Sequence, residues 1–99
     1  MKSVEVHPEA EAEEEQAFDR YWDESQTAAS GFWDELKDAY RRLRKNPQIG
    51  SPYLRGTRRI LLHRYPFCVV FRELPGKIQV IAVAHAKRRA GYWAKRLKQ

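Results

Sequence analysis

A histidine, three cations and a tyrosine are gathered in one short stretch near the carboxyl end of the chain. A hydrophobic run that begins at Ile78 closes on His85, and it is followed at once by Lys87, Arg88, Arg89 and Tyr92. An imidazole and a phenol can transfer protons, and ammonium and guanidinium groups can bind phosphate. The stretch therefore predicts a site that handles a phosphate or an RNA 2′-hydroxyl, placed just past the end of a rigid strand.

The net charge of +6 conceals a division between the two parts of the sequence. Residues 1–40 hold twelve acidic and three basic side chains, whereas residues 41–99 hold sixteen basic side chains and a single acidic one, Glu73. The simpler interpretation is that the two parts pair with each other across the fold. The balances of −9 and +15 leave cations unmatched, however, so we expect the second part to face a polyanion.

Length and composition exclude several classes of protein. Ninety-nine residues suit a single domain over residues 1–99 with one core. No apolar run approaches the roughly 20 residues that a membrane span needs, and the acidic residues 1–15 lack the apolar core of a signal peptide. One cysteine allows no internal disulfide, and the three histidines show no metal-ligand spacing. We expect a cytoplasmic protein with no metal, no cofactor and no membrane contact.

The elements that position the candidate site begin with a short strand at residues 3–7. Pro8 suits the first turn of a helix, and the acidic side chains after it complement the positive end of the helix dipole. Apolar residues then recur at helical spacing, which predicts a helix from about Pro8 to Gln26. Its remaining carboxylates are expected to form a solvated face, namely Glu11, Glu13, Glu14 and Glu15.

A second helix is predicted to return antiparallel to the first. Residues 27–31 are expected to form the turn, with Ser30 as the N-cap of the second helix. An apolar stripe from Phe32 to Leu43 follows, and Asn46-Pro47 ends it. The two helices should therefore form a hairpin.

The period changes to that of strands after a loop at residues 48–57. Strands are predicted over residues 58–65, 67–73 and 78–84. The expected fold is α+β in the order β-α-α-β-β-β, with the helix hairpin packed on an antiparallel meander sheet and a basic C-terminal tail.

Strict alternation along these strands assigns their side chains to two faces. One face holds Ile60, Leu62, Phe67, Val69, Phe71, Ile78, Val80 and Ala82, and the other holds Leu61, Val70, Ile81 and Val83. The helix hairpin can cover only one face. The second face must be covered by the tail, residues 88–97, or by a partner chain.

Three segments of the sequence follow one another in a distinctive order: the helix hairpin ending at Asn46-Pro47, residues 58–67 (RRILLHRYPF) and residues 80–89 (VIAVAHAKRR). In order and spacing they resemble the RelE/ParE superfamily, the toxins of bacterial type II toxin–antitoxin modules. The resemblance covers nearly the whole chain and implies a small α+β fold. It also implies a cognate antitoxin as partner, whose carboxy-terminal segment wraps the toxin and would cover the second apolar face.

The resemblance leaves two activities open, because one branch of the superfamily cleaves mRNA in the ribosomal A site and another inhibits DNA gyrase without cleaving RNA. Tyr92 matches an essential tail tyrosine of the ribosome-dependent enzymes, and Arg59 matches one of their strand cations. Leu61, Cys68 and Ala86, however, occupy positions where those enzymes carry a lysine or an arginine. These three departures count against cleavage.

Candidate roles follow from the residues and from the resemblance together. His85 and Tyr92 form a candidate acid/base pair, because some nucleases of the superfamily combine a tail histidine with a tyrosine, and Arg59 is the third candidate catalytic residue. The candidates for binding nucleic acid or another anion are Arg58, Lys87, Arg88 and Arg89.

Structural roles are the alternative for several of these residues. His85 could simply close its strand through hydrogen bonds, and Tyr92 with Trp93 could pack the tail onto the sheet. His63 is expected to be a half-buried strand residue, and Cys68 a small filler of the core or face.

The sequence thus favours a growth-inhibiting toxin that acts on the ribosome and its mRNA, or on DNA gyrase, and that a cognate antitoxin neutralises. If the protein is an enzyme, it is expected to be a metal-independent endoribonuclease. The alternative is a non-catalytic nucleic-acid-binding or autoregulatory module that keeps the same fold.

Overall fold

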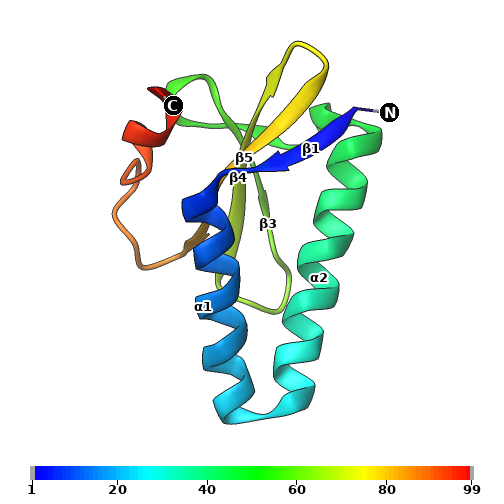
Figure 1. The fold of residues 1–99 in the computed structure, drawn as a ribbon, viewed down its shortest axis with the longest axis vertical. Helices are drawn as coiled ribbons and strands as arrows, with labels where there is room; N and C mark the ends of the chain where they lie inside the picture. Colours follow the sequence, from blue (N-terminus) through cyan, green and yellow to red (C-terminus); the bar gives the residue numbers. More distant parts are fainter. Residues whose placement is uncertain (1, 99) are drawn as a thin grey trace.

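Two helices pack on one face of a five-stranded sheet in the computed structural model, which describes residues 2–98 (Figure 1). The helices are α1 (Pro8–Glu24) and α2 (Gln26–Lys45), and they run antiparallel to each other. The strands are β1 (Ser3–Val6), β2 (Ser51–Pro52), β3 (Arg58–Leu61), β4 (Phe67–Leu74) and β5 (Lys77–His85). The predicted α+β class, helix hairpin and β3-β4-β5 meander are confirmed.

The sheet is mixed, in the order β1-β5-β4-β3-β2. β1 runs parallel to β5, with Val4 opposite Ile78 and Val6 opposite Val80. β2 adds a two-residue antiparallel ladder to β3 inside the segment that the sequence predicts to be a loop. Because β1 ends at Val6 and the chain turns into α1, the last residues of β5 have no strand beside them on that edge.

The helix hairpin turns at Ser25, so the predicted turn at residues 27–31 and the predicted N-cap at Ser30 are wrong. The Ser25 N–H donates to the carbonyl of Tyr21 at the end of α1, and its hydroxyl accepts from the Ala28 N–H at the start of α2. One extended residue therefore caps both helices. The pair Ala28-Ala29 has high helix propensity and continues α2 rather than interrupting it.

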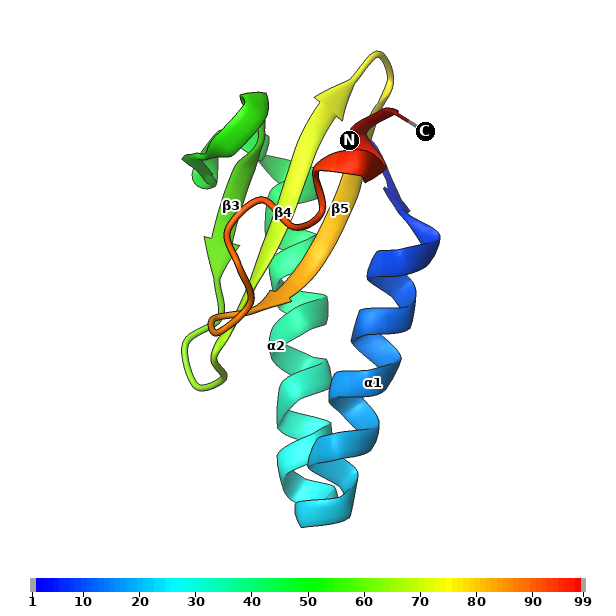
Figure 2. The ribbon, with the colours of Figure 1, turned by 90° about the vertical axis from the view of Figure 1, so that its left-hand side faces the viewer.

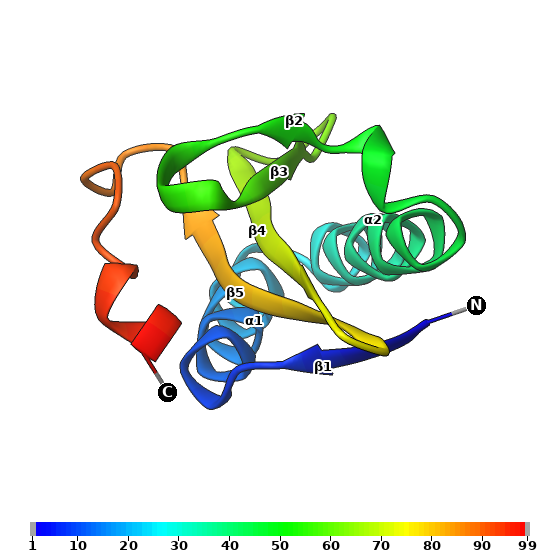
Figure 3. The same cartoon turned by 90° about the horizontal axis from the view of Figure 1, so that it is seen from above.

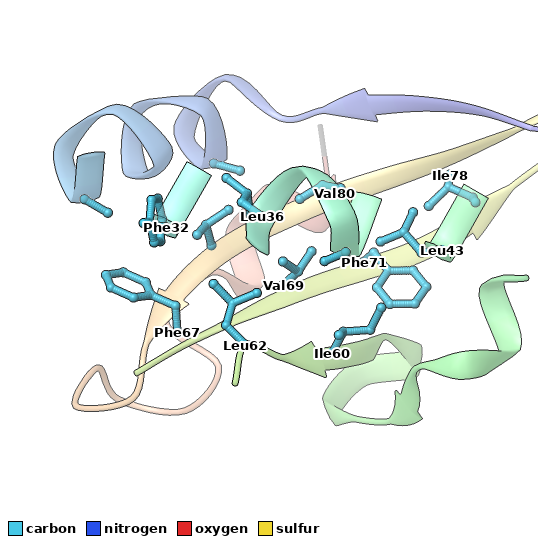
Figure 4. Packing of buried hydrophobic residues seen from close by; sticks show 14 residues of the cluster. Phe32, Leu36, Leu43, Ile60, Leu62, Phe67, Val69, Phe71, Ile78 and Val80 are labelled. Carbon is cyan, nitrogen blue, oxygen red and sulfur yellow. The ribbon is translucent and has the colours of Figure 1, made fainter. Parts of the chain in front are cut away.

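The main core lies between the hairpin and the sheet (Figure 4). Phe32, Leu36 and Leu43 of α2 are fully buried against the strands. Across from them lie Ile60, Leu62, Phe67, Val69, Phe71, Ile78 and Val80, all on the predicted face. Each fully buried large apolar side chain contributes about 1.5–3 kcal/mol relative to exposure, so this layer fixes the hairpin on the sheet.

A β-bulge in β5 reverses the predicted faces of two residues. Val70 pairs with Ala82 and the next residue of β4, Phe71, pairs with Val80, so Ile81 is the extra residue. Ile81 and Ala82 consequently both lie in the cluster away from the helices, while Val83 joins the main core. The strict alternation that assigned Ala82 to the helix face and Val83 to the opposite face fails at this bulge.

β3 is shorter than predicted and ends at Leu61. Residues 62–66 turn back toward β4, and the side chain of Glu35 on α2 accepts hydrogen bonds from the N–H groups of His63 and Arg64. His63 is exposed in this turn, so its predicted position in a half-buried strand is wrong.

The tail covers most of the second face of the sheet, on the side away from α2 (Figure 3). Trp93 is 2% exposed and packs with Cys68, Val70, Ile81, Ala82 and Ala84. Tyr53, Tyr92 and Leu97 pack around this second cluster. The second face was expected to be covered either by the tail or by a partner chain, and the structure shows the tail packed on it. Leu61 is not covered and is 61% exposed.

Candidate functional site

The chain turns sharply at the end of β5, where the predicted site residues begin (Figure 2). The N–H of Ala86 donates to the carbonyl of Pro66 at 2.7 Å, and the N–H of Arg88 donates to the carbonyl of His85 at 3.0 Å. These bonds fix the backbone on both sides of Lys87. The exposed cations Lys87, Arg88 and Arg89 are thus presented on a held turn rather than on a free tail.

His85 closes the strand and takes part in the same turn. Its Nδ1 accepts the N–H of Lys87 at 3.0 Å, and its ring lies edge-on to Phe67 with centroids 5.0 Å apart. Because Nδ1 accepts a hydrogen bond, the neutral ring must carry its proton on Nε2. In this arrangement the imidazole can donate a hydrogen bond through Nε2, but neither ring nitrogen is free to accept a proton.

Tyr92 is held by α1. Its hydroxyl donates to Oε2 of Glu13 at 2.6 Å, and the guanidinium of Arg88 lies 3.8 Å above the centre of its ring. Burial raises the pKa of the Tyr92 phenol, and the hydrogen bond and charge of Glu13 raise it further. The phenol therefore stays protonated and donates its hydrogen bond to the Glu13 carboxylate, so it is poorly suited to act as a base.

Glu13 is the centre of a network that ties the tail to α1 and β5. Besides Tyr92, it binds Arg96 through both carboxylate oxygens, at 2.9 and 3.1 Å, and it accepts the N–H of Val83. Arg96 also donates to the carbonyl of Ile81, the extra residue of the bulge. The network thus satisfies backbone groups that the open edge and the bulge of β5 leave without a strand partner.

The predicted solvated face of α1 is therefore wrong for two of its four glutamates. Glu13 is mostly buried, and Glu14 is 7% exposed and accepts the hydroxyl of Tyr40. The sequence contained a signal for this, because Ala10, Ala17 and Tyr21 define a buried stripe on which positions 13 and 14 also fall. The group of four glutamates suggests a solvated face, although helical spacing places Glu13 and Glu14 on the buried stripe.

Arg59 lies on the tail side of the sheet, opposite Val70 in the ladder between β3 and β4. Its guanidinium stacks 4.2 Å from the centre of the Tyr53 ring. Burial raises the pKa of the neighbouring Cys68 thiol and Arg59 partly offsets this, so the thiol is not activated. Arg59, His85 and Tyr92 line one hollow of about 230 Å³, together with Arg88 and Arg89.

A second hollow on this face contains the three positions that depart from the ribosome-dependent pattern. Leu61, Cys68 and Ala86 all line it together with Arg59, and its volume is about 290 Å³. Its other lining residues are Leu62, Tyr65, Pro66, Phe67 and Ala84. Where a nuclease of that pattern would place cations, this chain has an almost wholly apolar surface.

Arg58 does not join the other site residues. Its guanidinium donates to the carbonyl of Gly50 at 2.7 Å and to the side chain of Gln48 at 2.8 Å. These bonds hold the segment between α2 and β2 against the start of β3. A Cβ at Gly50 would meet the ring of Phe71, so a glycine is needed for this close approach.

A groove on the other side of β5 separates α1 from the turn after the strand. It has a volume of about 300 Å³ and is lined by Glu13, Gln16, Ala17, Arg20, Phe67, Val83, His85, Lys87 and Arg88. The cation Arg20 was not among the predicted site residues, because it lies in the acidic part of the sequence. The bulge turns Val83 toward α1, and the ring of His85, two residues later, packs on Phe67 and lines this groove as well as the hollow of Arg59 and Tyr92.

The described chain offers neither a membrane-spanning helix nor a metal site. No helix within residues 2–98 is both long and apolar enough to cross a membrane. In that same span no three side chains of histidine, cysteine, aspartate or glutamate are grouped so that they could hold a metal ion.

Comparison with known proteins identifies a family and solved structures of similar fold. Residues 4–90 match the family model described as the ParE toxin of the type II toxin–antitoxin system parDE. The structure is similar to a solved chain from the chromosomal ParDE toxin–antitoxin system of P. aeruginosa, with a TM-score of 0.75 and 21% identity, covering 88% of this chain and 98% of that one. That likeness establishes the shared fold. No curated protein sequence matches significantly.

Proposed function

The chain belongs to the family of ParE toxins of type II toxin–antitoxin systems, and from this membership we propose that it arrests growth by inhibiting DNA gyrase rather than by cutting mRNA. The observation that carries the proposal is the apolar hollow formed by Leu61, Cys68 and Ala86. Cleavage of RNA next to a 2′-hydroxyl places extra negative charge on the phosphorane, and cations must offset it. Arg59 is the one cation among the residues that line this hollow.

The state of the two candidate proton-transfer groups supports the same proposal. The Tyr92 hydroxyl is bound to Glu13, and Nδ1 of His85 accepts a backbone N–H. Neither group is poised to take a proton from a 2′-hydroxyl, which cleavage requires. Both residues instead hold the turn and tail that present Lys87, Arg88 and Arg89.

RNA cleavage remains the second candidate, favoured by one observation. Arg59, His85 and Tyr92 line a single hollow, so a cation, a proton donor and a phenol lie around one space. If this site were catalytic, Arg59 would stabilise the phosphorane. Tyr92, released from Glu13 and deprotonated, would take the proton of the 2′-hydroxyl. His85, protonated to the imidazolium and released from the Lys87 N–H, would give its Nε2 proton to the leaving oxygen.

We assign the exposed end of β3 to the cognate antitoxin. β2 pairs only with Arg58 and Arg59, so the outer edge of β3 beyond them is open, and Leu61 is 61% exposed there. An open edge beside an apolar side chain suits an added strand or extended segment of a partner. Binding at this edge would place the antitoxin beside Arg59 and the turn after β5, where it would block the basic surface in the cytoplasm.

The test is to induce the chain without an antitoxin and to follow growth, the DNA-damage response and mRNA integrity. Gyrase inhibition predicts growth arrest with induction of the DNA-damage response, and loss of supercoiling when the purified chain is added to gyrase and relaxed plasmid. Breaks within translated codons, together with unaffected supercoiling, would replace this proposal by RNA cleavage. Normal growth at high levels of folded protein would favour the non-catalytic binding module.

A further inference from the structure

We propose that the groove between α1 and the turn after β5 is a binding site for the phosphate of a nucleotide, either free or within a single strand. The bulge at Ile81 turns Val83 toward α1. His85 and Arg88 stand between this groove and the hollow of Arg59 and Tyr92, since they line both, but neither lines the apolar hollow of Leu61. The proposed site does not depend on whether the toxin acts on gyrase or on mRNA.

Cations from two distant parts of the chain meet in this groove. Arg20 comes from α1, and Lys87 and Arg88 come from the turn after β5. Arg20 is exposed, and within residues 2–98 it forms no ion pair, even though Asp23 and Glu24 follow three and four residues later. An unpaired arginine in an otherwise acidic helix, facing two further cations, is the arrangement that a bound anion would explain.

The carboxylate of Glu13 does not cancel this charge. Its Oε1 is bound by Arg96 and the N–H of Val83, and its Oε2 by Arg96 and the hydroxyl of Tyr92. Since Arg96 offsets its negative charge and its oxygens are occupied as acceptors, Glu13 acts as part of the groove wall. The groove therefore keeps an excess of positive charge.

The uncharged lining identifies the class of anion. Ala17, Phe67 and Val83 provide apolar surface, whereas the side-chain amide of Gln16 and the Nε2–H of His85 provide donors. A volume of about 300 Å³ is at the lower end of the range for small-ligand sites. This lining fits one nucleotide unit better than an inorganic anion. The cations would bind the phosphate, and the apolar surface would contact a base or sugar.

Binding can be measured by titrating the purified full chain with inorganic phosphate, AMP and a short single-stranded oligonucleotide, followed by NMR. We expect AMP to bind at least about tenfold more tightly than phosphate, because the apolar surface adds contacts that phosphate lacks. Signals of the Gln16 amide, the His85 ring and the backbone of residues 85–89 should shift. If the oligonucleotide binds more tightly than AMP, the natural ligand is a single strand. If AMP binds more tightly, the natural ligand is a free nucleotide.

Matched variants make the assignment specific. Arg20→Gln and Lys87→Gln should each weaken AMP binding by about tenfold, the worth of one charge-assisted contact. Arg44→Gln removes the same charge from an exposed site on α2 outside the groove and should leave the affinity unchanged. The proposal is overturned if Arg44→Gln weakens binding as much as Arg20→Gln, if AMP binds no better than phosphate, or if no shifts occur at millimolar AMP. A supercoiling assay on Arg20→Gln reports separately on the proposed gyrase inhibition.

Discussion

The hydroxyl of Tyr92 in the tail lies 2.6 Å from a carboxylate oxygen of Glu13 in α1, which makes an acidic residue of the first helix the anchor of the basic end of the chain. Arg96 completes this anchor with two hydrogen bonds to the same carboxylate. The division of charge along the sequence is therefore partly an internal pairing at this point. The cations of the turn between β5 and Tyr92 form no ion pair with a carboxylate among the described residues.

Loss of the Glu13 carboxylate should destabilise the fold strongly. Glu13→Gln leaves the guanidinium of Arg96, 9% exposed, with only the more distant and exposed carboxylate of Glu9 at 3.8 Å, and breaking a pair buried to this extent costs about 3 kcal/mol. Urea denaturation followed by circular dichroism measures the change. Glu15→Gln is the matched control, because Glu15 is exposed on the same helix, and it should change stability by less than about 0.5 kcal/mol. Equal effects of the two substitutions would contradict the anchoring role of Glu13.

The tail should depend equally on Trp93. This side chain is 2% exposed at the centre of the second cluster, so Trp93→Ala should cost about 3–5 kcal/mol. Trp22→Ala makes the same chemical change where the side chain is 47% exposed, and its cost should be clearly smaller. Thermal melts of the two variants provide the comparison. If Trp93 did not anchor the tail, the two variants would have similar melting temperatures.

The sequence predicted the layers of this fold because periodicity reports burial directly. Alternation in β3 and β4, and the helical spacing of Phe32, Leu36 and Leu43, each point apolar groups to one side. Periodicity could not predict the bulge at Ile81, because the bulge is set by how β5 pairs with Val70 and Phe71 of β4. The parallel position of β1 depends likewise on a partner far along the chain.

The candidate site was less predictable than the fold, for a related reason. Residue type indicated that His85, Tyr92 and the cations belong together, and the structure places them around the end of β5. Their protonation and availability depend on partners, however: a backbone N–H for His85 and Glu13 for Tyr92. Such contacts across the chain determine whether a candidate acid or base is free, and residue spacing carries no information on them.

A pH-dependent stability difference is expected at Glu14. Burial raises the pKa of this carboxyl, opposed in part by its hydrogen bond from Tyr40. Because the folded state then holds the proton more tightly than the unfolded state, the contribution of Glu14 to stability is present below its ordinary pKa of 4.5 and is lost as the pH rises through the raised value.

Glu14→Gln removes this titration while keeping an oxygen that can accept from Tyr40. The variant and the native chain should therefore have similar stability in acid, and the variant should become the more stable as the pH rises to neutral. Urea denaturation across that range measures the difference. Glu15→Gln, at an exposed position, should show no such trend. A difference in the free energy of unfolding between Glu14→Gln and the native chain that stays constant with pH would contradict a raised pKa of Glu14.

Substitutions at the end of β5 should separate the two mechanisms of toxicity. Under gyrase inhibition His85 and Tyr92 only support the turn, so the double variant His85→Ala/Tyr92→Phe should still arrest growth once its folding has been confirmed by a thermal melt. Arg88→Gln/Arg89→Gln removes two exposed cations of the turn, each contributing on the order of 1 kcal/mol to a charged interface. The concentration that half-inhibits gyrase supercoiling should then rise by about tenfold or more.

The pair Arg44→Gln/Lys45→Gln is the control for net charge, since it removes two exposed cations from the end of α2, away from the turn. It should leave both growth arrest and supercoiling inhibition near the native level. If His85→Ala/Tyr92→Phe instead abolishes growth arrest in a folded chain while the arginine variant retains it, the phenol and the imidazole perform chemistry. The bond from Tyr92 to Glu13 would then have to open when substrate binds, because only a released hydroxyl could take part in proton transfer.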